Sequence, residues 1–187
     1  MARSALLEQA ESRWWSGVAA GSIVIVVVVL AARVDWLEAL AEGDDVFTAR
    51  FRIPVVSGWV GFPEALTAAV EEARRRSEDP WGTHLFFDDD GALVGFGGFK
   101  GPPREGEVEL GYAVAPSRQG RGIATAVVEQ LLSRARTADV RIVSAHTLAA
   151  ENASTAVLRK CGFIHTDQSH ESVGDVWRWE RVVAASE

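Results

Sequence analysis

The residues best suited to chemistry form the turn at 117–122, which reads Ser-Arg-Gln-Gly-Arg-Gly. Gly120 and Gly122 have no Cβ atom to hold a ligand away from the backbone, and Arg118 and Arg121 add mobile positive charge. A helix that begins here leaves its first amides unpaired at the positive end of the helix dipole. The turn therefore predicts an anion site that suits a diphosphate. On glycine spacing alone, an ordinary strand-to-helix turn with solvated arginines is the competing interpretation.

A strand and a helix must position this turn. Alternate apolar residues before Pro116 predict a strand whose buried face carries Val108, Leu110, Tyr112 and Val114. Pro116 ends that strand because it lacks a backbone N–H. From Gly122 onward the apolar residues recur about every three to four positions, which predicts a helix.

The segment 119–124 resembles the Q/R-x-x-G-x-G/A signature of the GNAT superfamily of acetyl-CoA-dependent N-acetyltransferases. Glu109-Leu110-Gly111-Tyr112 looks like that superfamily's fourth strand, and the segment 152–163 is similar to its second cofactor-side motif. The resemblance covers roughly residues 84–165. The turn fits P-loop nucleotide binders poorly, because no Gly-Lys-Ser/Thr closes it.

The resemblance implies an α+β fold with a mixed, mostly antiparallel sheet of about seven strands, flanked by helices. Its fourth and fifth strands would splay apart. It also implies acetyl-CoA as co-substrate, with the diphosphate on the glycine turn and the pantetheine arm between the splayed strands. The cofactor-binding residues implied in this way are Ala113, Val114, Gln119, Gly120, Arg121, Gly122, Ile123, Ala124, Thr125, Asn152 and Ser154.

Glu109 and His146 are the candidate general bases, because an amine of high pKa must lose a proton before it can attack. Glu109 belongs to the fourth-strand motif, and His146 lies where some N-terminal-amine acetyltransferases of the resembled family carry a glutamate. Of the two, we favour Glu109. A solvent-exposed strand residue and a hydrogen-bonded core histidine are the alternative interpretations. Leu158 stands where many family members have a tyrosine thought to protonate the departing thiolate, and Tyr112 is the only tyrosine.

Composition limits the function further. The 187 residues carry a net charge of −7, which argues against general nucleic-acid binding and is compatible with cationic amine substrates. A single cysteine, Cys161, fits a reducing cytoplasm, where we expect this protein. No metal-ligand spacing is present. The three aspartates at 88–90 are more simply a solvated hairpin tip, because consecutive side chains on a turn diverge.

The N-terminal region is ambiguous. Residues 1–21 read as a helical extension and residues 22–187 as a single acetyltransferase domain. The segment 14–32 has the length and flanking residues of a membrane span, but its β-branched stretch at 22–30 favours a buried strand. Asp35 and Glu38 then resemble a capping box for a helix at 36–41.

Apolar periodicity also predicts the remaining helices and strands. We expect helices at 44–51, 63–76 and 152–160, and strands at 84–87, 92–100, 141–147, 163–168 and 176–183. Asn152 is the expected N-cap of the last helix.

Together these features predict an enzyme that transfers an acetyl group directly from acetyl-CoA to a primary amine. The acceptor is a small molecule or a peptide N-terminus. Two alternatives stay open: a non-catalytic acyl-CoA-binding regulatory domain, and a membrane-anchored acetyltransferase. A homodimer is also open, whereas we expect no nucleic-acid partner.

Overall fold

The computed structural model describes residues 26–76, 79–171 and 174–183. The predicted helical extension at 1–21 and most of the membrane-span candidate at 14–32 therefore lie outside the described residues. The division into an extension and one domain stays a prediction. Among the described residues, no helix is both long enough and apolar enough to cross a bilayer.

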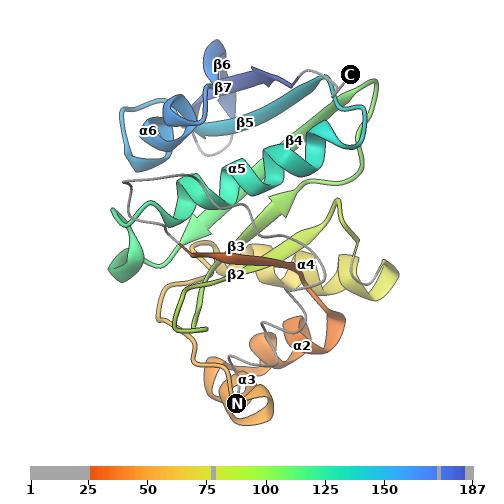
Figure 1. Cartoon of the computed structure of the whole chain (residues 1–187), viewed down its shortest axis with the longest axis vertical. Coiled ribbons are helices and arrows are strands. Elements are labelled where there is room, and N and C mark those ends of the chain that lie inside the picture. The colour runs from red at the N-terminus through yellow and green to blue at the C-terminus, as the bar shows by residue number, and fades with distance from the viewer. Residues whose placement is uncertain (1–25, 77–78, 172–173, 184–187) are drawn as a thin grey trace.

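Within the described part of the chain, seven strands form one sheet in the order β1-β2-β3-β4-β5-β7-β6 (Figure 1). They are β1 (Val28–Ala31), β2 (Thr83–Phe87), β3 (Leu93–Phe99), β4 (Glu107–Val114), β5 (Ile142–Leu148), β6 (Ile164–Glu171) and β7 (Gly174–Val182). Every neighbouring pair is antiparallel except β4 and β5, which are parallel. The predicted α+β fold with a mixed, mostly antiparallel sheet is confirmed.

The helices are α2 (Val34–Glu42), α3 (Asp44–Phe51), α4 (Pro63–Arg75), α5 (Ile123–Arg136) and α6 (Ala153–Lys160), with a 3₁₀ turn η1 (Pro116–Arg118). Helices α2, α3 and α4 gather at the β1–β3 half of the molecule, whereas α5 and α6 lie with β4 and β5 (Figure 1). Pro63 begins α4 at a position where its missing N–H costs nothing.

Side-chain alternation divides the core between the two faces of the sheet. Leu85 and Phe87 pack with the α2–α4 helices, whereas Phe86 between them packs with α5. On β4, Val108 and Leu110 face α5 and are 4% and 1% exposed. The predicted buried face of this strand is confirmed, and the fold thereby holds the turn after β4 against the start of α5.

The parallel pairing of β4 and β5 is short. Cα partners run only from Glu107–Ile142 to Glu109–Ser144, although β4 continues to Val114 and β5 to Leu148. The two strands therefore separate after Glu109, as the resemblance implied. An opening between neighbouring strands leaves backbone hydrogen-bonding groups on both edges.

One local prediction is wrong. The chain does not form a capping box at Asp35 and Glu38, because α2 already begins at Val34 and its N-cap, Arg33, makes no side-chain cap bond. Asp35 lies in the first turn, where it pairs with the Arg33 guanidinium at 2.7 Å. An acidic group in that turn still favours the helix through its dipole.

Candidate active site

The N-terminus of α5 is uncapped. Its N-cap is Gly122, with φ 78° and ψ 0°, a left-handed conformation that glycine adopts without a Cβ penalty. The first amide after this turn with a protein acceptor is that of Ala126, which bonds to the Gly122 carbonyl. Within the described residues no protein group accepts a hydrogen bond from the amides of 120–125. These N–H groups can therefore bind an external anion.

The N-terminus of α6 is the opposite case. Asn152 Oδ1 accepts a bond from the Thr155 amide at 3.0 Å, and Thr155 Oγ1 accepts one from the Asn152 amide at 3.0 Å. This reciprocal cap confirms Asn152 as N-cap. The side-chain nitrogen of Asn152, Nδ2, also donates a hydrogen bond to the Ala150 carbonyl. Both ends of the Asn152 side chain are therefore used inside the protein.

A cavity of about 450 Å³ lies beside the uncapped α5 N-terminus. It extends from the end of β4 across the start of α5 to one side of α6. Its walls are formed by Gly58, Gly61, Phe62, Tyr112, Ala113, Val114, Pro116, Arg118, Gln119, Gly120, Gly122, Ile123, Ala124, Thr125, Ala153, Ser154, Ala156, Val157 and Lys160. The volume is in the range of small-molecule sites in proteins.

Two side chains fix the turn that leads into α5. Gln119 Nε2 donates to the Val114 carbonyl at 3.0 Å, so this side chain holds the turn to the end of β4. Arg118 Nε donates to Asp88 Oδ2 at 3.1 Å, and Asp88 is buried in the β2–β3 turn. The positive charge at the cavity is thus held in place rather than mobile.

The strand edge that borders the gap can be identified from its partners. The Glu109 carbonyl accepts a bond from the Lys100 amide, and the Ala115 amide donates to Val94, so both residues face β3. Because backbone groups alternate along a strand, Tyr112 and Val114 direct theirs toward β5. No β5 partner pairs with them after Glu109, although the Val114 carbonyl already accepts the bond from Gln119. This edge can bond an extended ligand.

Glu109 and His146 meet where β4 and β5 separate. His146 Nδ1 lies 3.0 Å from Glu109 Oε1, and their side chains are 26% and 27% exposed. No described residue bonds to His146 Nε2. Lys100 pairs with the same carboxylate oxygen. Burial raises the pKa of Glu109, but the hydrogen bonds from Lys100 and His146 outweigh it and hold that pKa below its usual value.

A second set of charges continues away from the gap on the same side of the sheet. Glu107 accepts bonds from Arg178 at 2.5 Å and from Ser144 at 3.0 Å. Its pKa is lowered, chiefly by the Arg178 hydrogen bond. Arg178 is also bonded to Glu180. Unlike Glu109, this carboxylate has no histidine among its hydrogen-bond partners in the described structure.

The model of the family described as an acetyltransferase (GNAT) domain matches residues 36–164 of this chain. The chain belongs to the GNAT acetyltransferase family. It is accordingly an N-acetyltransferase whose co-substrate is acetyl-CoA. No curated protein sequence matches it significantly.

Solved structures share the fold of this GNAT acetyltransferase at low sequence identity. A ribosomal L7/L12 α-N-protein acetyltransferase in complex with coenzyme A is 18% identical, with a TM-score of 0.66 over 88% of this chain and 98% of that chain. A ribosomal-protein-alanine N-acetyltransferase from Brucella melitensis is 23% identical, with a TM-score of 0.60 over 83% and 99%. A spermidine N-acetyltransferase chimera of Vibrio cholerae SpeG and hSSAT is 14% identical, with a TM-score of 0.62 over 83% and 95%.

The structure brings most of the predicted cofactor residues of this GNAT acetyltransferase to one cavity. The predicted residues in its walls are Ala113, Val114, Gln119, Gly120, Gly122, Ile123, Ala124, Thr125 and Ser154. Arg121 and Asn152 are not among the wall residues, and Asn152 serves instead as the α6 cap. The free amides beside the cavity suit the diphosphate of acetyl-CoA, so the donor set fits the co-substrate.

The loop at 57–62 forms a wall that the sequence did not indicate. Its Gly61 lies so close to β4 that a Cβ atom there would stand 2.7 Å from the Cβ of Ala113. Trp59, only 2% exposed, anchors the loop through a 2.9 Å hydrogen bond to Asp44. Phe62 is 62% exposed at the cavity. In the sequence, only the two glycines around Trp59 could have indicated this loop, and they follow neither a helical nor a strand periodicity.

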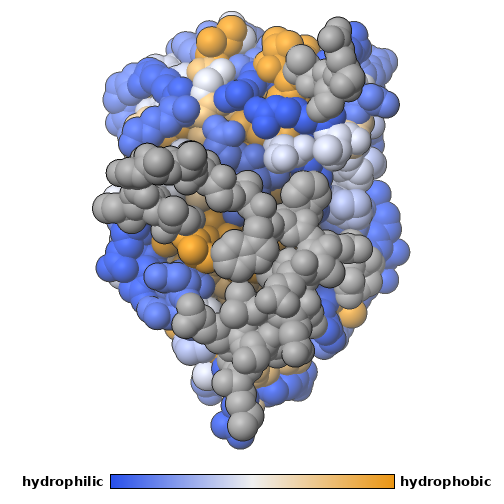
Figure 2. All heavy atoms as spheres, viewed as in Figure 1, coloured by the Kyte–Doolittle hydropathy of each residue, from blue (hydrophilic) through white to orange (hydrophobic). Residues whose placement is uncertain are grey.

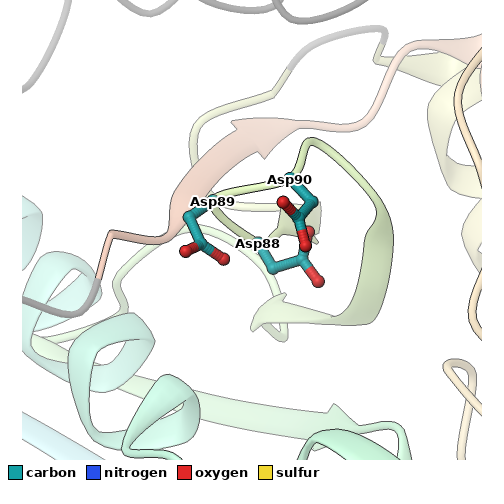
Figure 3. Close-up of side chains that lie close together, drawn as sticks. All are labelled: Asp88, Asp89 and Asp90. Carbon is teal, nitrogen blue, oxygen red and sulfur yellow. The ribbon is translucent and has the colours of Figure 1, made fainter.

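The three aspartates of the β2–β3 turn differ from the sequence expectation in two respects. Asp88 is 7% exposed rather than solvated, and the three carboxylates converge, with ligand atoms within 4.8 Å of one another (Figure 3). Asp88 Oδ1 accepts a bond from the Ala92 amide, and Oδ2 accepts the Arg118 bond. Asp88 therefore closes the turn and holds Arg118.

Proposed function

We propose that this acetyltransferase transfers an acetyl group directly to a primary amine, with Glu109 and His146 removing the proton. The observation that carries the proposal is the position of this pair at the point where β4 and β5 separate. The amine is either a small molecule or a peptide N-terminus. The names of its structural relatives, which include spermidine and ribosomal-protein N-acetyltransferases, support an amine of one of these kinds.

The co-substrate would be held by the uncapped α5 amides and by the free edge of β4. The amides of 120–125 would bond the diphosphate, with Arg118 and Gln119 at the same turn. The five residue steps from Val114 back to Glu109 span about 17 Å, which suits an extended pantetheine arm. A backbone amide near the end of that edge would then stabilise charge on the acetyl oxygen.

In the proposed mechanism Glu109 orients the imidazole of His146, and His146 accepts the proton. A carboxylate bonded to Nδ1 fixes the imidazole with its Nε2 lone pair free, which is the form a base requires. Glu109 remains ionised because its pKa is lowered. His146 Nε2 takes a proton from the ammonium form of the acceptor, and the neutral amine can then attack. The sequence favoured Glu109 as the base, whereas this geometry favours His146, with Glu109 orienting it.

The test is thiol release from acetyl-CoA with a panel of polyamines, small amines and peptides, followed by pH profiles of the variants. His146→Ala should lower kcat by about 100-fold or more. Glu109→Gln should also lower kcat, because the His146 ring loses its orienting partner. Glu107→Gln, on the same strand but bonded to Arg178, is the matched control and should retain activity. If none of the amines stimulates thiol release, or if His146→Ala is fully active, the proposal fails.

A non-catalytic acyl-CoA-binding domain is the second candidate. It is favoured by Leu158, which is 1% exposed in the core and cannot donate a proton at the position where the resembled family often has tyrosine. That function predicts tight coenzyme A binding with no thiol release in the same panel. A cytoplasmic location and a homodimer stay proposals, testable by fractionation and by light scattering.

A further inference from the structure

Lys100 brings a primary amine of the chain itself to the proposed proton-accepting pair. Its ammonium bonds to Glu109 Oε1, the same carboxylate oxygen that lies 3.0 Å from His146 Nδ1. The Lys100 backbone amide also donates to the Glu109 carbonyl at 2.9 Å, which fixes the lysine backbone beside Glu109. An amine of the class that the proposed reaction acetylates therefore already lies against the pair.

Resting on the proposed function, we propose that Lys100 is a self-acetylation site, at which the enzyme transfers an acetyl group from acetyl-CoA to its own Lys100 Nζ. A lysine side chain ends in a primary amine on a flexible four-carbon stem, and this amine can lose a proton. The guanidinium of arginine stays protonated in proteins and could form the same ion pair without becoming an acceptor.

The use of lysine at this carboxylate is exceptional in the chain. Only two of its 19 lysines and arginines are lysine, namely Lys100 and Lys160. Every other ion pair between described residues takes its cation from arginine or histidine. Glu107, two residues before Glu109 on β4, follows that pattern with Arg178. The one lysine ion pair of the described structure thus stands at the carboxylate that also bonds the proposed base.

The amine is within reach of the place proposed for the acetyl group. The pantetheine arm would run back along the free edge of β4 and end near Glu109, where β4 and β5 separate. Lys100 directly follows β3, on the other side of Glu109, and neighbouring strands are about 4.8 Å apart. Its side chain is 63% exposed, so packing does not hold the stem in one position. Rotation about the stem bonds therefore carries Nζ from the carboxylate toward the gap.

Lys160 provides an internal comparison. It lines the cofactor cavity from the last turn of α6, whereas Lys100 is not among the cavity residues. Among the described residues, however, Lys160 bonds to no carboxylate and to no histidine that could take its proton. Proximity to the thioester carrier alone would favour acetylation of Lys160. A requirement for the proton-accepting pair favours Lys100 instead, because an ammonium ion cannot attack a carbonyl carbon.

The step balances with acetyl-CoA as the other reactant. The Lys100 ammonium gives one proton to the Glu109–His146 pair, and the neutral amine forms a bond to the acetyl carbon. The carbon–sulfur bond breaks, and its electron pair goes to sulfur. The acylated nitrogen loses a second proton, which sulfur takes up. The products are acetyl-lysine, the free thiol of coenzyme A and the proton on the pair, which passes to water.

Mass spectrometry of the full chain after incubation with acetyl-CoA, without an added amine, tests the inference. We expect the chain to gain an acetyl group that peptide mapping places at Lys100, with a first-order rate that does not depend on protein concentration. Equal labelling of Lys100 and Lys160 would overturn the inference. So would an equal rate at Lys100 in urea-unfolded protein, because both results describe unassisted chemical acetylation.

Two variants on β4 test the role of the pair. Glu109→Gln removes the carboxylate that holds the ammonium and orients His146, so acetylation of Lys100 should slow by about 100-fold. Glu107→Gln is the matched control and should keep the wild-type rate, because Glu107 is bonded to Arg178 instead. Labelling of Glu109→Gln at the wild-type rate would show that the pair is not involved, and the inference would be wrong.

The outcome for the wild-type protein separates this inference from the proposed function. Thiol release with an added amine but no acetyl group at Lys100 overturns self-acetylation alone. A protein that neither releases thiol with any amine nor acetylates Lys100 overturns the proposed function as well.

Discussion

The substitution Gly122→Asp would supply α5 with the kind of cap that α6 already has. The new carboxylate would stand beside amides that have no protein partner in the described structure. An N-cap carboxylate accepts bonds from the first-turn amides and therefore competes with a diphosphate for them. Gly122→Asn is the matched control, because asparagine has the same shape and capping ability without the charge.

The magnitude of the effect can be separated into strain and charge. Any L-residue at φ 78° costs about 1–2 kcal/mol, and Gly122→Ala measures that part alone. A carboxylate about 4 Å from one phosphate charge is repelled by about 4 kcal/mol at an effective dielectric constant of about 20. If side-chain motion and salt halve that energy, about 2 kcal/mol is left, or about 30-fold in Kd. We therefore expect Gly122→Asp to bind coenzyme A about 30- to 1000-fold more weakly than Gly122→Asn.

Isothermal titration calorimetry with coenzyme A and with pantetheine tests this reasoning. Pantetheine lacks the diphosphate, so the difference between the aspartate and asparagine variants should disappear with that ligand. Thermal unfolding checks that the three variants at Gly122 are folded. If Gly122→Asp and Gly122→Asn bind coenzyme A equally well, the diphosphate does not lie on these amides, and the central element of the proposed site is wrong.

Three further predictions concern stability and reactivity. Burial and the neighbouring Arg134 lower the pKa of His84 from 6.5 to about 4. The contribution of neutral His84 to the free energy of unfolding is therefore complete above pH 6.5 and is lost as the pH falls toward 4. The free energy of unfolding measured in urea should fall by up to about 3 kcal/mol over that pH range, and it should fall by less in His84→Gln. Asn152→Ala should cost about 1 kcal/mol in the same assay by removing the bond to Thr155, with little change in coenzyme A affinity. Cys161, with its pKa raised to about 12, should react with a thiol reagent only after unfolding; rapid labelling of the folded protein would contradict its burial.

Local patterns predicted the elements around the site well, because each is set by periodicity. The alternation along β4 and the switch to helical spacing at Gly122 are both present in the structure. The N-cap at Asn152 was predictable because the side chain and its partner lie three residues apart. The apparent capping box at Asp35 failed because the same pattern also arises inside a first turn, where the acid pairs with Arg33.

Contacts between distant segments could not be read from such patterns. Nothing near Asp88 indicates that it will hold Arg118, thirty residues later in the chain. The approach of the loop at 57–62 to β4 likewise depends on a tertiary contact at Gly61. The pairing of Glu109 with His146 follows from the parallel register of β4 and β5, which local patterns do not determine. The sequence could therefore name two candidate bases but could not show that their side chains bond to each other.

The surface and the site use polar groups in different ways. On the face shown in Figure 2 hydrophilic residues cover most of the described surface, and hydrophobic residues gather at the end where β6 and β7 lie and in a patch near the middle. At the cavity, by contrast, the groups that matter lack partners within the described residues: the amides of 120–125, the β4 edge at Tyr112 and the free nitrogen of His146. Exposed to water, such groups cost little, but they offer a ligand bonds without first breaking protein bonds. The proposed direct transfer requires a thioester and an amine to be bound together, and this unpaired set at one gap is what the proposal assigns to them.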